Sequence, residues 1–341
     1  MSDILLVLHT ESDGSFSKSA LESITSAADF AAQSGTPFDA AVMGVGAAAA
    51  ADMIAGCGAQ KIYVVEDDAV SVSRYATDVK AVEALIRASG AHIILAPGTS
   101  RFVRCMPGAA FRTDASIDTH IVDLQAGEGS FKARRWYYRQ RILTTFTRET
   151  LPCIMLLDGG VNSVWEGEAG SADKENISVD FGDAVAVTTV EGVESPAVEA
   201  QTIRPDAPLL FVAGAGWTKK QSDGECHVGD AGVIIQGFLG KANASLGSSK
   251  SLVDLQTEGQ ETLSFMSHMN QIGQTGSTPR HAKGLSTCCH GEEPHAVGWR
   301  FINERRAINL DTNCGWAQGK ADVVYIGDAF EIITKVNALL G

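Results

Sequence analysis

The chain has 341 residues, of which 45% are hydrophobic and 20% are charged, and its formal net charge is −14 at pH 7. This length is enough for two domains, each with a core of its own. The acidic balance argues against a nucleic-acid-binding protein, because neutralising phosphates requires concentrated Lys and Arg. Apolar runs such as residues 93–97 and 153–157 are far shorter than the roughly 20 residues that cross a bilayer, so we expect no membrane insertion.

Cysteine usage and the first residues favour a cytoplasmic protein. Seven cysteines are scattered along the chain, and two of them, Cys288 and Cys289, are adjacent. An odd count with an adjacent pair does not fit a disulfide framework. The sequence Met1-Ser2-Asp3 leads directly into apolar residues, without the basic flank and cleavage site of a signal peptide. We therefore expect a reducing, cytoplasmic location.

The first 160 residues alternate short apolar β runs with helical stretches, which predicts a mostly parallel sheet covered by helices. The first helix follows Ser17, a favourable N-cap, and ends at Gly35, and a later helix ends at Gly90. From residue 120 to residue 157 the β runs are closely spaced, so we expect an antiparallel ribbon at the edge of the sheet. The expected parallel strands are residues 4–8, 38–43, 61–65 and 92–96.

Residues 132–141 depart from the acidic balance, because they contain five basic and three aromatic residues. Such a segment is typical of a surface that binds single-stranded nucleic acid. A pair of strands with one solvated basic face gives the same pattern in a chain that is otherwise acidic. Contact with an acidic partner subunit is a third interpretation.

A change of composition predicts where the first domain ends. Residues 159–208 are rich in Gly, Ser, Glu and Val and have little periodicity, which is typical of an inter-domain connection. We therefore expect an N-terminal domain over residues 1–160, a connection over 161–207 and a C-terminal domain over 208–341.

The C-terminal domain opens with a buried strand that runs into small residues at 209–217. Open α/β sheets place their ligands at this carboxyl edge of the strands. The dinucleotide fingerprint is incomplete, because Lys219 occupies the position of its third glycine. Asp328 is expected to begin the last amphipathic helix. Further strands are expected near residues 285–288, 307–309 and 323–326.

The segment Met269-Asn-Gln-Ile-Gly-Gln-Thr-Gly276 joins two glycines to side-chain amides and a hydroxyl. Glycines let backbone amides approach a bound group, and Gln274 and Thr275 supply directional donors and acceptors. The segment therefore predicts a cofactor loop, although a surface turn uses the same residue types.

With these motifs in place, the chain resembles the alpha subunit of electron transfer flavoproteins over nearly its whole length. The most specific match is Gln271-Ile-Gly-Gln-Thr-Gly276, which looks like the V-G-Q-T-G loop of that family. The resemblance implies an α/β fold with a flavodoxin- or Rossmann-like, doubly wound domain at the C-terminus that binds FAD. It also implies an electron carrier rather than an enzyme with its own substrate. Its partners would be a beta subunit, a donor dehydrogenase and a downstream acceptor such as a quinone oxidoreductase.

The resemblance carries over cofactor-binding positions one residue at a time. Ser249 matches a flavin-contacting serine, and Lys250 follows it where an arginine is usual. Asn309 and Asp328 match residues near the adenosine half of FAD, and His295 matches a histidine that faces the flavin. The complete set of expected cofactor-binding residues is Gly216, Ser249, Lys250, Ile272, Gly273, Gln274, Thr275, His290, Gly291, His295, Asn309, Asp328 and Ala329.

Departures from the family pattern lie in the same region. Gly216 replaces an arginine that contacts FAD, and Lys250 lacks the planar guanidinium of the usual arginine. Glu292 and Glu293 put acidic groups near the expected flavin. These departures suggest a dedicated donor, such as an amine or N-demethylating dehydrogenase. They also motivate the alternative of an FAD-free scaffold subunit in a larger dehydrogenase complex.

A second alternative is a subunit that binds a metal through cysteine and histidine. The segment Cys288-Cys-His-Gly-Glu-Glu-Pro-His295, together with Cys226 and His227, offers thiolate and imidazole ligands. Structural zinc sites usually use cysteine pairs separated by two to four residues, whereas adjacent residues often point apart. We therefore expect no metal site. No nucleophile and base can be paired from their spacing, so no catalytic residue is expected.

Overall fold

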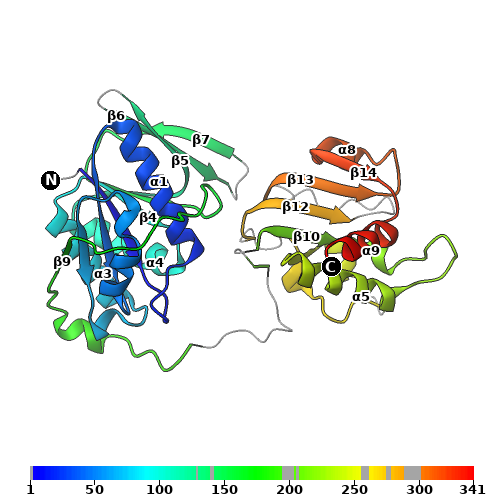
Figure 1. Ribbon diagram of the computed structural model, residues 1–341, viewed down its shortest axis with the longest axis horizontal. Helices are drawn as coiled ribbons and strands as arrows, with labels where there is room; N and C mark the ends of the chain where they lie inside the picture. The colour runs from blue at the N-terminus through cyan, green and yellow to red at the C-terminus, as the bar shows by residue number, and fades with distance from the viewer. Residues whose placement is uncertain are drawn as a thin grey trace. The chain divides into compact units, whose positions relative to one another are not determined.

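The computed structural model describes residues 3–127, 130–138, 142–193, 203–204, 207–254, 261–273, 278–287 and 301–341. The chain divides into two compact units, residues 1–193 and residues 194–341 (Figure 1). No helix in these ranges is both long enough and apolar enough to cross a bilayer.

In the described residues, the first unit is built on a nine-stranded sheet with the order β7-β6-β5-β8-β4-β1-β2-β3-β9. Its strands are β1 (Ile4–His9), β2 (Phe38–Met43), β3 (Ile62–Val65), β4 (Ile93–Pro97), β5 (Ser116–Gly127), β6 (Ser130–Tyr137), β7 (Ile142–Thr147), β8 (Cys153–Leu157) and β9 (Lys174–Asn176). The pairs β5–β6 and β6–β7 are antiparallel, and the other pairs are parallel.

Two hydrophobic cores explain why β1 is apolar at successive positions. Leu6 and Leu8 pack on one face of the sheet with α1 and α2, while Leu5 and Val7 pack on the other face with α3 and α4. A parallel strand covered on both faces needs no polar alternation. The helices are α1 (Lys18–Ser34), α2 (Ala47–Met53), α3 (Tyr75–Ser89) and α4 (Ser100–Arg112), with single turns at η1 (Ala55–Cys57), η2 (Asp68–Val70) and η3 (Gly182–Ala186).

Local sequence signals set the ends of α1. The Ser17 hydroxyl accepts a hydrogen bond from the Ala20 amide, and Gly35 ends the helix in the left-handed region at φ 63°. These are the preferred roles of serine and glycine at helix ends. The predicted caps of this helix, and Gly90 as the end of α3, are confirmed.

Strand β8 differs from the expected antiparallel edge. It lies inside the sheet, parallel to both β4 and β5. All five of its residues, Cys153–Leu157, are buried. A continuous apolar run is typical of a strand with both faces covered. This run therefore indicates an interior strand, whereas the closely spaced β runs before it had suggested an antiparallel edge. The ribbon itself is confirmed for β5, β6 and β7.

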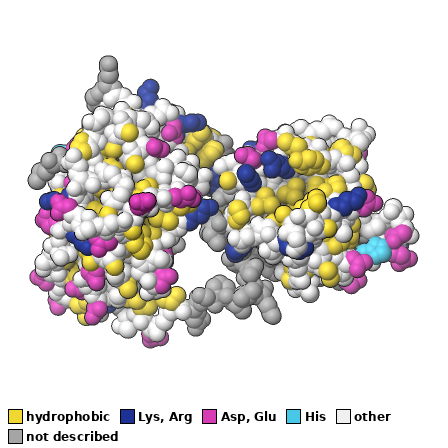
Figure 2. Space-filling model, viewed as in Figure 1, with side chains coloured by type: hydrophobic (Ala, Val, Ile, Leu, Met, Phe, Trp, Pro, Cys, Tyr) yellow, Lys and Arg dark blue, Asp and Glu magenta, His cyan; other side chains and the backbone are white. Residues whose placement is uncertain are grey.

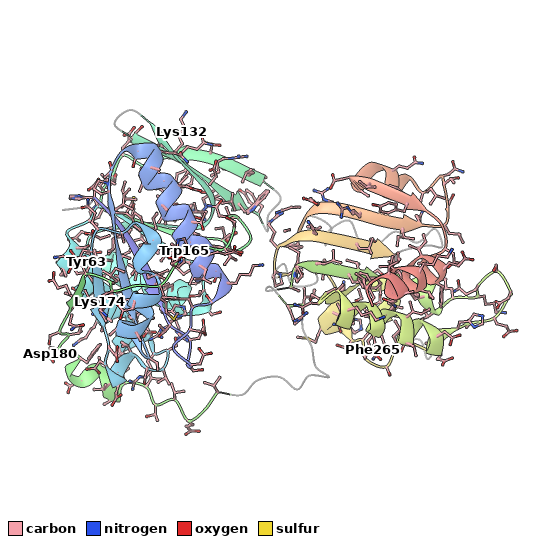
Figure 3. The ribbon with its side chains drawn as sticks, viewed as in Figure 1. Tyr63, Lys132, Trp165, Lys174, Asp180 and Phe265 are labelled. Carbon is pink, nitrogen blue, oxygen red and sulfur yellow. The ribbon has the colours of Figure 1, made fainter. Side chains whose placement is uncertain are left out.

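Residues 158–193 form a strap along the first unit. The Trp165 amide donates to Leu21 O on α1, and Lys174 Nζ lies 2.6 Å from Asp52 Oδ2 on α2. Strand β9 then pairs with β3, and Lys80 Nζ donates to Asp180 O, 3.0 Å away. Figure 3 labels Trp165, Lys174 and Asp180 along this path. Much of the segment expected to be a connection is thus bonded to the first unit.

In the described residues, the second unit contains a five-stranded parallel sheet with the order β11-β10-β12-β13-β14. Helices α5 and α9 share a core with one face of the sheet, and Ala321, after α8, packs on the other face. The elements are β10 (Leu209–Ala213), η5 (Ala215–Thr218), α5 (Val228–Lys241), β11 (Ser245–Ser248), α6 (Lys250–Asp254), η6 (His268–Asn270), β12 (His281–Thr287), β13 (Ile302–Asn309), α8 (Gly315–Lys320), β14 (Val323–Ile326) and α9 (Ala329–Leu339).

The edge strand β14 leaves apolar side chains in solvent. Val323, Tyr325 and Ile326 are each 41–51% exposed. Figure 2 shows hydrophobic side chains on the visible face of the second unit. In the described residues β14 pairs with β13 alone.

Candidate functional site

The strands of the second unit end at one level. Ala213 is the cross-strand partner of both Ser248 and Thr287, and Thr287 is in turn the partner of Ile308. Gly216 lies in the η5 turn after β10, and Ser249 directly follows β11. Asn309 is the last residue of β13, and Asp328 lies between β14 and α9. The fold therefore brings residues more than 100 positions apart to one edge, as expected for ligand sites of open parallel sheets.

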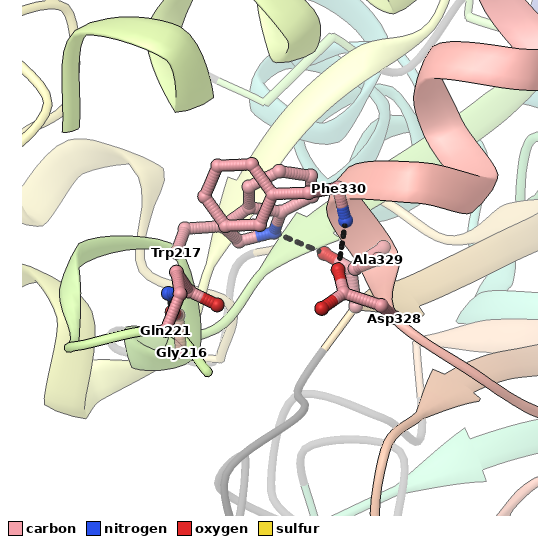
Figure 4. A pocket seen from close by; sticks show the side chains of 7 residues that line it. Gly216, Trp217, Gln221, Asp328, Ala329 and Phe330 are labelled. Carbon is pink, nitrogen blue, oxygen red and sulfur yellow. Dashed lines mark hydrogen bonds between the residues drawn. The ribbon is translucent and has the colours of Figure 1, made fainter. Parts of the chain in front are cut away.

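A small hollow opens at this edge (Figure 4). Three of the predicted residues, Gly216, Asp328 and Ala329, line it. Because Gly216 has no side chain, a ligand can approach its backbone closely. The other lining residues are Trp217, Gln221, Thr287 and Phe330.

Trp217 and Thr287 hold the inner wall of the hollow. Trp217 Nε1 donates to Thr287 Oγ1 at 2.7 Å, and that hydroxyl donates to Val212 O at 3.1 Å. The Trp217 ring packs against Phe330 with the ring centroids 4.6 Å apart. Both polar groups are therefore satisfied despite complete burial. No local sequence motif marks this pair, since the contact joins positions 70 residues apart.

Ser249 links the end of β11 to α6. Its amide donates to Ala213 O at 2.9 Å, and its hydroxyl accepts from the Leu252 amide at 3.3 Å. The next residue, Lys250, is 49% exposed and forms an ion pair with Asp254 one helical turn later. Its ammonium group is thus shared with a carboxylate.

The loop that contains Ile272 and Gly273 attaches to the same strand. The Ile272 amide donates to Ser248 O at 3.1 Å, and the Ile272 side chain covers Gly247, where a Cβ atom would come within 2.8 Å of it. Gly273 has φ 75°, and its amide donates to Thr278 Oγ1 at 2.7 Å. Gly273 thus adopts a left-handed backbone that other residues rarely take.

Asn309 and Asp328 shape two neighbouring turns. Asn309 is 1% exposed, and its Nδ2 donates to Asp311 O. The main-chain carbonyl of Asn309 accepts a hydrogen bond from the Gly327 amide at 3.0 Å. Asp328 is the N-cap of α9, with Oδ1 accepting from the Phe330 amide at 2.7 Å. Asp328 therefore begins the last helix, as predicted, and also lines the hollow.

Several predicted positions lie outside the described residues. They are Gln274, Thr275, His290, Gly291 and His295, together with Cys288 and Cys289.

Cys226 and His227 bear on the metal alternative. Cys226 is exposed, and His227 Nε2 lies 2.7 Å from Asp223 Oδ2. The hydrogen bond to that carboxylate raises the pKa of His227. Within the described ranges, no three His, Cys, Asp or Glu side chains are placed to hold a metal ion.

The fold defines a class of protein with two α/β units, and the second sheet carries polar residues at the carboxyl edge of its strands. Residues 5–184 match the sequence profile of the electron transfer flavoprotein domain. The chain belongs to the electron transfer flavoprotein family. The match covers the first unit, so the candidate site lies beyond it.

Two relatives extend the similarity to the second unit. The electron transfer flavoprotein subunit alpha of Syntrophomonas wolfei subsp. wolfei (strain DSM 2245B / Goettingen) is 25% identical over 333 residues, which cover 96% of each chain. The protein of the same name from Mycobacterium leprae (strain TN) is 24% identical over 338 residues, which cover 98% of this chain and 96% of the relative. At this level of identity, the chain is a divergent member of the family.

Proposed function

We propose that the chain is the alpha subunit of a heterodimeric electron transfer flavoprotein that holds FAD in its second unit. It would pass single electrons from a donor dehydrogenase to an acceptor such as a quinone oxidoreductase. The observation that carries this proposal is the similarity to two alpha subunits over at least 96% of the chain. The cluster of predicted residues at the carboxyl edge of the second sheet adds support.

The residues at this edge fit a dinucleotide. Ser248 Oγ is buried at the carboxyl end of β11 and has no hydrogen-bond partner within the described ranges. Burying such a hydroxyl costs free energy unless a ligand or water satisfies it. Gly216 and Gly273 leave room for close backbone approach. When bound, FAD would supply the redox chemistry, since a flavin accepts a hydride and releases electrons singly.

The chain's own residues would bind and orient that cofactor. Asn309 and Asp328 would contact its adenosine half, while Ser249 and the loop at Ile272 and Gly273 would lie along the flavin-bearing half. Lys250 would lend positive charge to the reduced flavin, weakened by its ion pair with Asp254. Gln274, Thr275, His290, Gly291 and His295 would complete the site.

The departures at Gly216 and Lys250 motivate a dedicated donor. We propose an amine or N-demethylating dehydrogenase in the cytoplasm, rather than an acyl-CoA dehydrogenase. The test is to compare the rates at which purified dehydrogenases of the two classes reduce the heterodimer. Efficient reduction by the acyl-CoA enzyme alone would refute this choice of donor.

A second candidate is an FAD-free scaffold subunit. It is favoured by the absence of Lys and Arg from the described lining of the hollow and by the engagement of Lys250 with Asp254. Both features weaken the attraction for a cofactor that carries two phosphates.

Co-expression with the beta subunit separates the two candidates. The carrier predicts a yellow heterodimer that releases about one FAD on denaturation and bleaches on reduction in two one-electron steps. The scaffold predicts a colourless complex. A colourless chain that also fails to bind a beta subunit would contradict the carrier and call for metal analysis of the Cys288–His295 segment.

A further inference from the structure

The amide of Gln221 has an orientation that its neighbours determine. Its Nε2 donates to Gly216 O at 3.0 Å and to Lys219 O at 2.6 Å. Carbonyl oxygens only accept hydrogen bonds, so the nitrogen end of the amide must face this turn. The oxygen end, Oε1, must therefore point away from the turn.

Figure 4 shows where that oxygen points: across the hollow, toward the carboxylate of Asp328. One carboxylate oxygen, Oδ1, already accepts from the Phe330 amide. Neither Gln221 Oε1 nor Asp328 Oδ2 receives a hydrogen bond from any side chain or amide in the described part of the chain. Two acceptors of partly exposed residues thus face one hollow, and no donor from the described residues lies between them.

The surroundings favour a neutral or cationic donor over an anion. Trp217 and Phe330 provide apolar walls. A larger pocket shares Gln221, Asp328 and Phe330 with the hollow, and its other charged residues are Asp223, Asp230, Glu331 and His227. In the described residues neither pocket is lined by Lys or Arg. A phosphate would be repelled here, whereas hydroxyl or amino groups would satisfy both acceptors.

We propose that Gln221 is a ligand-contacting residue that, with Asp328, selects a group carrying two hydrogen-bond donors at the adenosine end of bound FAD. The shared chemistry is a paired donor, supplied either by the vicinal hydroxyls of the ribose or by the purine amino group. The inference rests on the proposed function. It also requires the diphosphate of the cofactor to run away from the acidic pocket.

Two substitutions separate ligand contact from support of the turn. Gln221→Lys keeps donors for Gly216 O and Lys219 O but has no acceptor, whereas Gln221→Met lacks both. Gln318→Lys is the matched control, because Gln318 also donates to a backbone carbonyl, Thr312 O, but does not line the hollow. The readout is the dissociation constant of FAD, measured by flavin fluorescence with the deflavinated heterodimer.

The proposal predicts that Gln221→Lys and Gln221→Met both weaken FAD binding by about fivefold or more, since each loses one hydrogen bond to the ligand. Gln318→Lys should bind as the wild type does. If Gln221 only supported the turn, Gln221→Lys would also bind as the wild type does, and the proposal would fail. A wild-type heterodimer that takes up no FAD would instead overturn the proposed function itself.

Two FAD analogues identify the donor. An analogue with 2′-deoxyadenosine lacks one ribose hydroxyl, and one with hypoxanthine in place of adenine lacks the amino group. Weaker binding of the first analogue assigns the ribose, and weaker binding of the second assigns the purine. If both analogues bind the wild-type heterodimer as tightly as FAD does, no paired donor is selected and the proposal is wrong.

Discussion

The cysteines of the described chain differ in what surrounds their sulfur. Cys57, Cys105 and Cys153 are buried, whereas Cys226 is exposed. Burial raises the pKa of the Cys105 and Cys153 thiols to about 12. At pH 8 a thiol with that pKa is ionised to only about one part in ten thousand, and the thiolate is the reactive form.

We therefore predict that brief alkylation at pH 8 labels Cys226 and spares Cys105 and Cys153. Unfolding in guanidinium should make the two buried thiols react as well. Peptide mass spectrometry before and after unfolding checks this. Labelling of Cys105 in the folded chain would contradict the burial of its side chain on α4.

His9, at the end of β1, gives a pH dependence of known sign. Its Nδ1 donates to Thr10 O at 3.2 Å and its Nε2 accepts from the Thr99 hydroxyl at 2.8 Å, so the neutral ring satisfies both contacts. Burial lowers the pKa of His9, a nearby Arg101 adds to this, and the Thr10 carbonyl and Asp78 oppose it. The unfolded chain then binds more protons, and stability falls as the pH drops below about 6.5, the ordinary histidine value.

We predict that the free energy of unfolding of His9→Gln depends less on pH between 7 and 5 than that of the wild type. Urea titrations at several pH values measure this. His92→Gln is the control, because His92 is exposed and paired with Asp3. An identical pH dependence in the wild type and His9→Gln would exclude His9 as the cause.

One buried carboxylate on β5 joins the three strands of the ribbon. Asp118 on β5 is 2% exposed and lies 2.9 Å from Arg135 Nη1 on β6 and 2.6 Å from Arg148 Nε after β7. One arginine of the basic segment 132–141, Arg135, is thus paired with a buried carboxylate. Arg134, on the same strand, lies 3.8 Å from the partly exposed Asp123.

We predict that Asp118→Asn destabilises the first unit by about 3 kcal/mol, since it leaves two arginines without their charged partner. Asp123→Asn, the matched control, should cost less than about 1 kcal/mol. Guanidinium titrations give both values. Hydrogen exchange should also show faster opening of β6 and β7 in Asp118→Asn, and equal stability of the two variants would refute this account.

The helices and strands differ in how well the local sequence predicts them. Ser17, Gly35 and Asp328 act within one turn of their own helices, so local chemistry predicted those boundaries. Strand β11, with the sequence Ser-Leu-Gly-Ser, carries no such signal, because its strand form depends on pairing with the distant β10. Helix α4 was missed for a related reason: it contains Pro107, which local propensity disfavours and tertiary packing tolerates.

Some residues of the candidate site could be predicted from the sequence, and others depend on the tertiary structure. The resemblance supplied Gly216, Asp328 and Ala329, which line one hollow. Gln221 and Thr287 belong to no motif, and they reach that hollow through backbone turns and strand register. Predicting them would have required the three-dimensional path of the chain.

The strap, residues 158–193, extends the first unit well beyond residue 160. Strand β9 covers the outer edge of β3, and the contacts of Trp165, Lys174 and Asp180 lie beyond residue 160. We predict that a fragment of residues 1–193 melts cooperatively, while residues 1–160 melt at a lower temperature or aggregate. Circular dichroism and size-exclusion chromatography compare the two, and equal melting temperatures would show that the strap contributes nothing.

The open side of β14 has a consequence for handling the protein. Among the described strands β14 pairs on one side only, so its outer backbone groups and the exposed Val323, Tyr325 and Ile326 form a template on which another strand can add. The purified chain should therefore aggregate as it is concentrated. Tyr325→Lys would place a charge on that rim, and dynamic light scattering should show smaller particles and a longer storage life.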